Sequence, residues 1–173
     1  MPPFPLEAGP CLIRPWRRGD KPALVKHADN RRIWRNLRDA FPHPYTAKEA
    51  DAWLAHVAEQ EPVTSFAIET DGEAVGGIGL MLATDIHRLS AEIGYWLGEG
   101  FWGRGIATAA LQAFTPWAFQ TFALERIWAG VFATNPASMR VLEKAGYLRE
   151  AILRRAVVKD GEVLDQVIFA TVR

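Results

Sequence analysis

The fold is decided by the stretch Glu92-Ile-Gly-Tyr-Trp-Leu-Gly-Glu-Gly-Phe-Trp-Gly-Arg-Gly-Ile-Ala-Thr-Ala-Ala-Leu111. Its first part has the aromatic and branched apolar residues of a strand, and its last part has the Ala and Leu of a helix. The segment between them is rich in glycine, which lets a main chain approach a ligand closely. The first turn of a helix also presents unpaired N–H groups and a positive dipole end. We therefore expect the main chain from Gly103 to Thr108 to hold a phosphate-bearing ligand.

The spacing of this turn excludes two familiar phosphate sites. A P-loop ends in Gly-Lys followed by Ser or Thr, but Gly105 is followed by Ile106. A dinucleotide fingerprint needs a third glycine where Thr108 stands, and an acidic residue at the end of the next strand, which is absent here. The ligand is therefore expected to be neither a P-loop nucleotide nor a dinucleotide.

The turn resembles motif A of the GNAT acetyltransferases, whose pattern is Gln/Arg-x-x-Gly-x-Gly/Ala. Here it reads Trp102-Gly-Arg-Gly-Ile-Ala107, which departs from the pattern only at its first position. With the preceding Gly-Tyr-Trp-Leu-Gly-Glu, it is similar to the branch that contains ribosomal-protein N-terminal acetyltransferases. The resemblance implies that the turn binds the pyrophosphate of acetyl-CoA and that the preceding strand splays from its neighbour to bind pantetheine through free backbone groups. The residues concerned are Tyr95, Trp96, Leu97, Trp102, Gly103, Arg104, Gly105, Ile106, Ala107 and Thr108.

A second segment, Asn135-Pro-Ala-Ser138 followed by a helix and Gly146-Tyr147, resembles motif B of the same family. The resemblance implies that Asn135 binds the pantetheine arm and that Ser138 lies near the sulfur, where its hydroxyl could reprotonate the leaving thiolate. Many family members carry a tyrosine four residues past the serine position, but this chain has Leu142 there. The alternative is structural: Asn135 caps a helix and Ser138 is a first-turn residue with no further role.

Acetyl transfer to an amine also requires a base. Glu92 is the candidate, acting directly or through water, because it stands in an apolar strand three residues before Tyr95. The alternatives are an outward-facing strand glutamate or a structural ion pair with Arg88 or His87. The amine is expected in a groove formed by the first helices and the loop from Phe41 to Tyr45. Candidate contacts are Trp34, Phe41, His43, Tyr45 and His87, although aromatic residues in such a loop can instead be core.

Composition places limits on the class of protein. The chain has 173 residues, with 20 basic and 20 acidic side chains, so nothing in the net charge favours nucleic acid or a membrane. The N-terminus lacks the features of a signal peptide, and the single cysteine suits a reducing compartment, so we expect a cytoplasmic protein. Cys11 is expected to be a small core or surface thiol, and no cluster suggests a metal.

The order of elements predicts one α/β domain over residues 10–173, after an irregular segment over residues 1–9. We expect a mixed, mostly antiparallel sheet of six to seven strands, about four helices, and a splay between the central strands, as in the GNAT fold. The first strand, from Cys11 to Trp16, is expected at an edge because Pro15 cannot donate to a ladder. The helix after the glycine turn is expected to reach about Phe119, with a kink or an early end at Pro116.

These features predict an acetyl-CoA-dependent N-acetyltransferase that transfers directly to a primary amine, either a protein N-terminus or a small molecule. No cysteine stands where an acetyl-enzyme would form. The alternative is a non-catalytic module that binds or senses acyl-CoA. A monomer and a homodimer are both compatible with the sequence.

Overall fold

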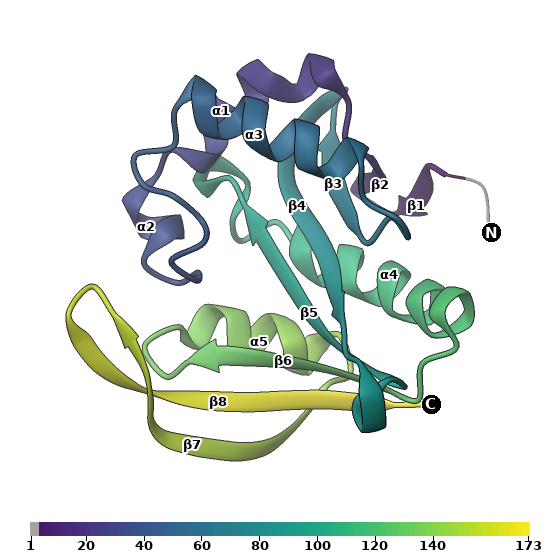
Figure 1. Ribbon diagram of the computed structural model, residues 1–173, viewed down its shortest axis with the longest axis vertical. Helices are drawn as coiled ribbons and strands as arrows, with labels where there is room; N and C mark the ends of the chain where they lie inside the picture. The colour runs from purple at the N-terminus through teal and green to yellow at the C-terminus, as the bar shows by residue number, and fades with distance from the viewer. Residues whose placement is uncertain (1–3) are drawn as a thin grey trace.

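The computed structural model describes residues 4–173 and contains one eight-stranded sheet in the order β1-β2-β3-β4-β5-β6-β8-β7 (Figure 1). All neighbouring strands are antiparallel except β5 and β6, which are parallel. The strands are β1 Leu6–Ala8, β2 Cys11–Pro15, β3 Ser65–Thr70, β4 Glu73–Leu82, β5 Ser90–Leu97, β6 Arg126–Phe132, β7 Leu148–Lys159 and β8 Glu162–Val172. The helices are α1 Lys21–Ala28, α2 Arg31–Trp34, α3 Ala47–Ala58, α4 Ile106–Phe122 and α5 Pro136–Lys144. The predicted α/β class and mostly antiparallel sheet are confirmed.

Helices cover both faces of the sheet. The larger core contains the apolar side of α4, with Ile106, Leu111 and Phe114, together with Ile93 of β5 and Leu142 of α5. On the other face α1 and α3 pack together in a second cluster, which Trp96 of β5 joins. Successive side chains of a strand point to opposite faces of the sheet, so Ile93 of β5 packs in the larger core and Trp96 packs against the second cluster.

Turn and cap residues explain most element boundaries. Asp71-Gly72 joins β3 to β4, and both residues have positive φ, as this kind of tight hairpin turn requires. The backbone N–H of Thr46 donates to the Glu49 carboxylate at 3.1 Å in the capping box that opens α3. Asn135 caps α5, with Pro136 at its first position. These boundaries agree with those predicted from the sequence.

Two expectations about the N-terminal end of the fold were wrong. Residues 1–9 were expected to be irregular, but Leu6–Ala8 form β1, which pairs with Cys11–Ile13; residues 1–3 lie outside the described part. Cys11–Pro15 is therefore an inner strand, and the sheet has eight strands instead of six to seven. The five α-helices over residues 4–173 agree with the expected number of about four, with the short α2 as the fifth. Of the two outcomes expected at Pro116, the early end does not occur: α4 continues to Phe122, with Trp117 and Ala118 packed in the core.

The predicted splay is present between β5 and β6. Their pairing covers only Ser90–Glu92 of β5 against Arg126–Trp128 of β6. Beyond Glu92 the two strands diverge like the arms of a V, with α2 and the turn between β7 and β8 at its open end (Figure 1). The glycine turn follows directly from the free end of β5, so the strand edge and the helix start face the same region.

A buried ion cluster ties the N-terminal strand to the sheet, and it carries the first prediction. Arg14 is 2% exposed, and its guanidinium donates two hydrogen bonds of 2.8 Å to the Asp20 carboxylate and a further one to Glu69. We expect Asp20→Asn to lower the free energy of unfolding by about 2 kcal/mol, because a buried charge loses its bidentate partner. Chemical denaturation measures this. Asp51→Asn, which breaks the exposed pair with Lys21, should cost less than about 1 kcal/mol, and equal losses would contradict the account.

Candidate active site

The glycine turn contains two residues in a left-handed backbone conformation. Gly103 and Gly105 have φ values of 72° and 75°, in the left-handed region that favours glycine. No protein atom lies within 4 Å of a Cβ built at either residue, so the turn faces open space. Gly105 is the N-cap of α4, and Ile106, 3% exposed, anchors the helix start in the core. The first-turn N–H groups of Ile106, Ala107 and Thr108 have no partner within the helix, which makes this end of α4 suited to an anion.

Trp102, the residue that departs from the family pattern, fastens the turn to the strand before it. Its indole Nε1 donates a 2.7 Å hydrogen bond to the carbonyl oxygen of Leu97, the last residue of β5. On its other side, the Arg32 guanidinium lies 5.4 Å from the ring centre. Arg104 lies in the same way over the ring of Phe101, at 5.3 Å. Trp102 thus fixes the distance between the end of β5 and the start of the helix.

We expect Trp102→Phe to weaken CoA binding about fivefold, because one hydrogen bond that orders the turn, about 1 kcal/mol, is lost. Isothermal titration calorimetry with CoA measures the effect. Trp53→Phe is the matched control, since Trp53 packs against Trp16 and His56 in the α1–α3 region. If Trp102→Phe binds CoA with the same dissociation constant as the unaltered protein, the hydrogen bond from Trp102 to Leu97 does not help to order the turn for binding.

The edge of β5 that faces the splay carries unpaired main-chain groups. The N–H of Gly98 bonds to the Val75 carbonyl, and the ladder alternation then directs the main chain of Trp96 toward β4. The groups of Tyr95 and Leu97 consequently point away from β4, into the splay. Among these groups, the Leu97 carbonyl oxygen already accepts the hydrogen bond from the Trp102 indole. The N–H and C=O of Tyr95 and the N–H of Leu97 can therefore pair with an extended ligand, as an added strand would; Trp96 contributes its side chain instead.

Asn135 and Ser138 lie together at the start of α5. The Asn135 side-chain oxygen accepts a 3.3 Å hydrogen bond from the Ser138 N–H, which confirms that Asn135 caps α5. The Ser138 hydroxyl is 2.7 Å from the hydroxyl of Tyr95 on β5. Leu142, where many family members have a tyrosine, is fully buried in the core. The hydroxyl groups on this face of the splay are thus those of Ser138 and Tyr95.

Glu92 points to the opposite face. Its carboxylate bonds Arg38 Nη2 at 2.5 Å, and its side chain is 14% exposed. The ion pair considered from the sequence is therefore present, but its partner is Arg38 in the loop after α2, and neither Arg88 nor His87. Because residues 92 and 95 differ by an odd number along one strand, Glu92 and the Tyr95–Ser138 pair flank the splay from its two sides. A carboxylate and a pair of hydroxyl groups thus lie on opposite faces of β5 beside the splay.

The predicted acceptor residues divide into three groups. Trp34 lies 5.6 Å from the His43 ring, and the Lys159 ammonium lies 3.9 Å from the Trp34 ring centre. Phe41 and Tyr45 pack on each other in the second core, and Tyr45 is only 4% exposed, so it supports the loop from within. His87 is exposed in the turn before β5, at the end of that strand remote from the glycine turn.

A cavity of about 330 Å³ lies beside Arg38, where the loop after α2 meets the end of β6 and the turn of β7 and β8. Its walls include Arg38, Leu37, Phe132 and Gln166. The buried Lys159, which also lines the cavity, pairs with Asp39 at 2.8 Å. Since Arg38 joins this cavity to Glu92, it is the candidate acceptor pocket.

A hydrogen bond and an ion pair, both made by Glu99, link the start of α2 to the glycine turn. Glu99 accepts a 2.7 Å hydrogen bond from the Asn30 amide and bonds the Arg32 guanidinium. The hydrogen bond from Asn30, with the charge of Arg32, holds the pKa of the Glu99 carboxyl below its usual value. The acceptor side of the splay is thereby fixed to the phosphate turn.

The acetyltransferase (GNAT) domain model matches residues 11–148. The chain belongs to the GNAT family. It is 37% identical to the "Probable N-acetyltransferase YjcK" of Bacillus subtilis over 65% of this chain and 63% of that one. It is 31% identical to the ribosomal-protein-serine acetyltransferase of Escherichia coli over 62% of this chain and 59% of that one. The matched segments thus span less than two thirds of either relative.

Among solved structures, RimJ of Mycobacterium smegmatis in complex with CoA-disulfide superposes with a TM-score of 0.84. The two chains are 30% identical, and the match covers 95% of this chain and 83% of RimJ. The GNAT fold predicted from the sequence is confirmed.

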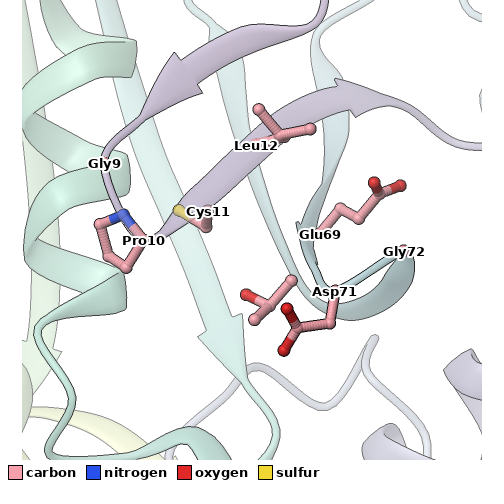
Figure 2. A pocket seen from close by; sticks show the side chains of 8 residues that line it. Gly9, Pro10, Cys11, Leu12, Glu69, Asp71 and Gly72 are labelled. Carbon is pink, nitrogen blue, oxygen red and sulfur yellow. The ribbon is translucent and has the colours of Figure 1, made fainter.

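The GNAT domain has a second hollow, at the far edge of the sheet. Figure 2 shows the side chains of Cys11, Leu12, Glu69 and Asp71 around this cavity of about 280 Å³. Cys11 is buried with its sulfur near the Ala8 carbonyl, and burial raises the pKa of its thiol to about 11. The thiol therefore stays protonated at neutral pH and is a poor nucleophile, which agrees with the core thiol predicted from the sequence.

Over residues 4–173, His, Cys, Asp and Glu side chains do not gather in groups of three or more that could hold a metal ion. In the same range, each helix is too short or too polar to span a bilayer.

Sequence reasoning missed one residue of the candidate site, Arg38, and the hydroxyl contact of a second, Tyr95. Arg38, the partner of Glu92, lies 54 positions away along the chain, and no motif surrounds it. The Tyr95 hydroxyl was missed because the family pattern draws attention to the main chain of that strand. A search for tyrosines that replace the absent one at Leu142 would have indicated Tyr95.

Proposed function

We propose that this GNAT protein is an acetyl-CoA-dependent N-acetyltransferase that acts by direct transfer in a ternary complex. The observation that carries the proposal is the splay itself. A free strand edge at Tyr95 and Leu97 runs into a helix start that suits a pyrophosphate, while Glu92 and Ser138 flank the opening from its two faces.

The chain's groups fit an extended thioester ligand. The N–H groups of Gly103–Thr108 and the dipole of α4 would hold the pyrophosphate, with the positively charged Arg104 and Arg32 nearby. The Tyr95 and Leu97 edge and the Asn135 side chain would hold the pantetheine arm. Acetyl-CoA supplies the activated acetyl group, whose C–S bond breaks as the new C–N bond forms.

Glu92 is proposed to take the proton that the attacking amine gives up, directly or through one water. In the described structure Arg38 orients the Glu92 side chain through an ion pair. A main-chain N–H of the β5 edge would face the developing oxyanion. Ser138 would hydrogen-bond the sulfur as it leaves, and the proton that ends on sulfur comes through that hydroxyl or from water.

The acceptor is proposed to be a primary amine that enters past Arg38 and the cavity beside it. The E. coli relative is named as a ribosomal-protein-serine acetyltransferase, which supports a protein N-terminus; a small-molecule amine is the other class. A cytoplasmic location remains a prediction from the single cysteine.

The test is to incubate the purified protein with acetyl-CoA and a panel of N-terminal peptides and small amines, following the release of free thiol. We expect at least one amine to release thiol well above the hydrolysis rate and to gain one acetyl group by mass spectrometry. Tight CoA binding without transfer to any amine would contradict the proposal and favour the acyl-CoA-binding module.

A further inference from the structure

Two hydroxyl groups from different elements meet inside the splay. Tyr95 Oη, on β5, lies 2.7 Å from Ser138 Oγ, on α5, and 3.3 Å from the Ser138 carbonyl oxygen. The phenol ring packs against the larger core, which fixes its direction. The Ser138 side chain thus has a preformed partner before any ligand binds.

The direction of this hydrogen bond decides what Ser138 can do. A phenol is the more acidic of the two hydroxyls and therefore the better donor, while the aliphatic Ser138 oxygen is the better acceptor. Burial raises the pKa of Tyr95 to about 12, against a smaller lowering by Ser138, so the phenol keeps its proton at neutral pH. When Tyr95 donates to Ser138 Oγ, the serine's own proton is free to turn toward the splay.

We propose that Tyr95 is a positioning residue that orients Ser138 toward the leaving sulfur, in a chain whose α5 carries the buried Leu142 where many relatives carry a tyrosine. This inference rests on the proposed function. Tyr95 donates to Ser138, and Ser138 donates to the thiolate, while neither gives up its proton for good. The pair lowers the free energy of the thiolate by hydrogen bonding, as a donor to a charged group does.

The proposal can be tested without an acceptor, from the pKa of the CoA thiol in the binary complex. The ultraviolet absorbance of the thiolate is followed against pH for CoA bound to the unaltered protein, Tyr95→Phe, Ser138→Ala and the double variant. The thiol of free CoA, titrated under the same conditions, gives the reference pKa. We expect the bound thiol to lie about one unit lower in the unaltered protein, because a hydrogen bond favours the charged form.

Ser138→Ala should raise the bound thiol's pKa by about one unit, and Tyr95→Phe by about half a unit. The double variant should equal Ser138→Ala, since Tyr95 acts through Ser138. Tyr147→Phe is the matched control: its hydroxyl is also buried and lies 2.7 Å from a threonine hydroxyl, that of Thr115. With an amine acceptor, Tyr95→Phe should lower kcat severalfold and leave the KM for acetyl-CoA unchanged.

The outcomes separate this inference from the proposed function. A bound thiol with the pKa of free CoA in the unaltered protein would overturn the inference even if the variants failed to fold. So would a Tyr95→Phe value equal to the unaltered one, or additive shifts in the double variant. If CoA does not bind the unaltered protein at all, the proposed function fails first, and the inference falls with it.

Discussion

Replacing Glu92 with glutamine is expected to lower kcat at least about 100-fold while the dissociation constant of acetyl-CoA stays the same. General base catalysis contributes about 10²- to 10⁴-fold, and a glutamine keeps the shape of the side chain but cannot accept the proton. Glu92 lies on the face of β5 opposite the Tyr95–Ser138 pair, so its charge is expected to act on the amine and not on the coenzyme. Steady-state kinetics with a responsive amine, and calorimetry with CoA, measure the two quantities.

The matched control is Glu150→Gln. Glu150 is also a strand carboxylate paired with an arginine, Arg126, but it lies on β7, which borders only β8. The control should keep its kcat. If Glu92→Gln turned over like the unaltered protein, Glu92 would be no more than one half of an ion pair with Arg38, and the base would have to be sought elsewhere.

Converting both Gly103 and Gly105 to alanine is expected to weaken CoA binding between about 30-fold and 1000-fold. Both residues have left-handed φ, and a side chain there costs about 1–2 kcal/mol per residue. The turn relieves this strain by leaving its conformation, which removes the array of N–H groups from the phosphates. Calorimetric titration with CoA gives the affinity, and thermal unfolding shows whether the fold persists.

The control for this pair is Gly9→Ala with Gly72→Ala. These glycines have φ of 60° and 81°, and no atom lies within 4 Å of a Cβ built at either, so the strain is matched. They stand in the β1–β2 and β3–β4 turns, outside both the Gly103–Thr108 segment and the gap between β5 and β6. Equal losses of CoA affinity in the two double variants would mean that the effect comes from general destabilisation and that the Gly103–Gly105 turn has no special role.

Local signals predicted much of this molecule because they act over a few residues. The glycine turn before Ile106, the Asn135 cap and the Asp71-Gly72 hairpin each follow from the conformations open to those residues. The splay was implied by family resemblance and not by any spacing, since the end of pairing at Glu92 depends on where β6 runs.

Long-range contacts explain what was missed. β1 forms because Leu6–Ala8 find a partner in β2, although the proline-rich segment has weak strand character of its own. Pro116 does not end α4, because core packing on both sides of it outweighs the lost hydrogen bond. The Arg38–Glu92 pair joins residues 54 apart and has no local signature.

The central claim is that main-chain amides from Gly103 to Thr108 hold the coenzyme's diphosphate. A crystal structure of the CoA complex tests it most directly. The account predicts phosphate oxygens within about 3.2 Å of several of those amide nitrogens, with the sulfur between the Glu92 and Ser138 side chains. Phosphates bound elsewhere, or a sulfur remote from both side chains, would contradict it.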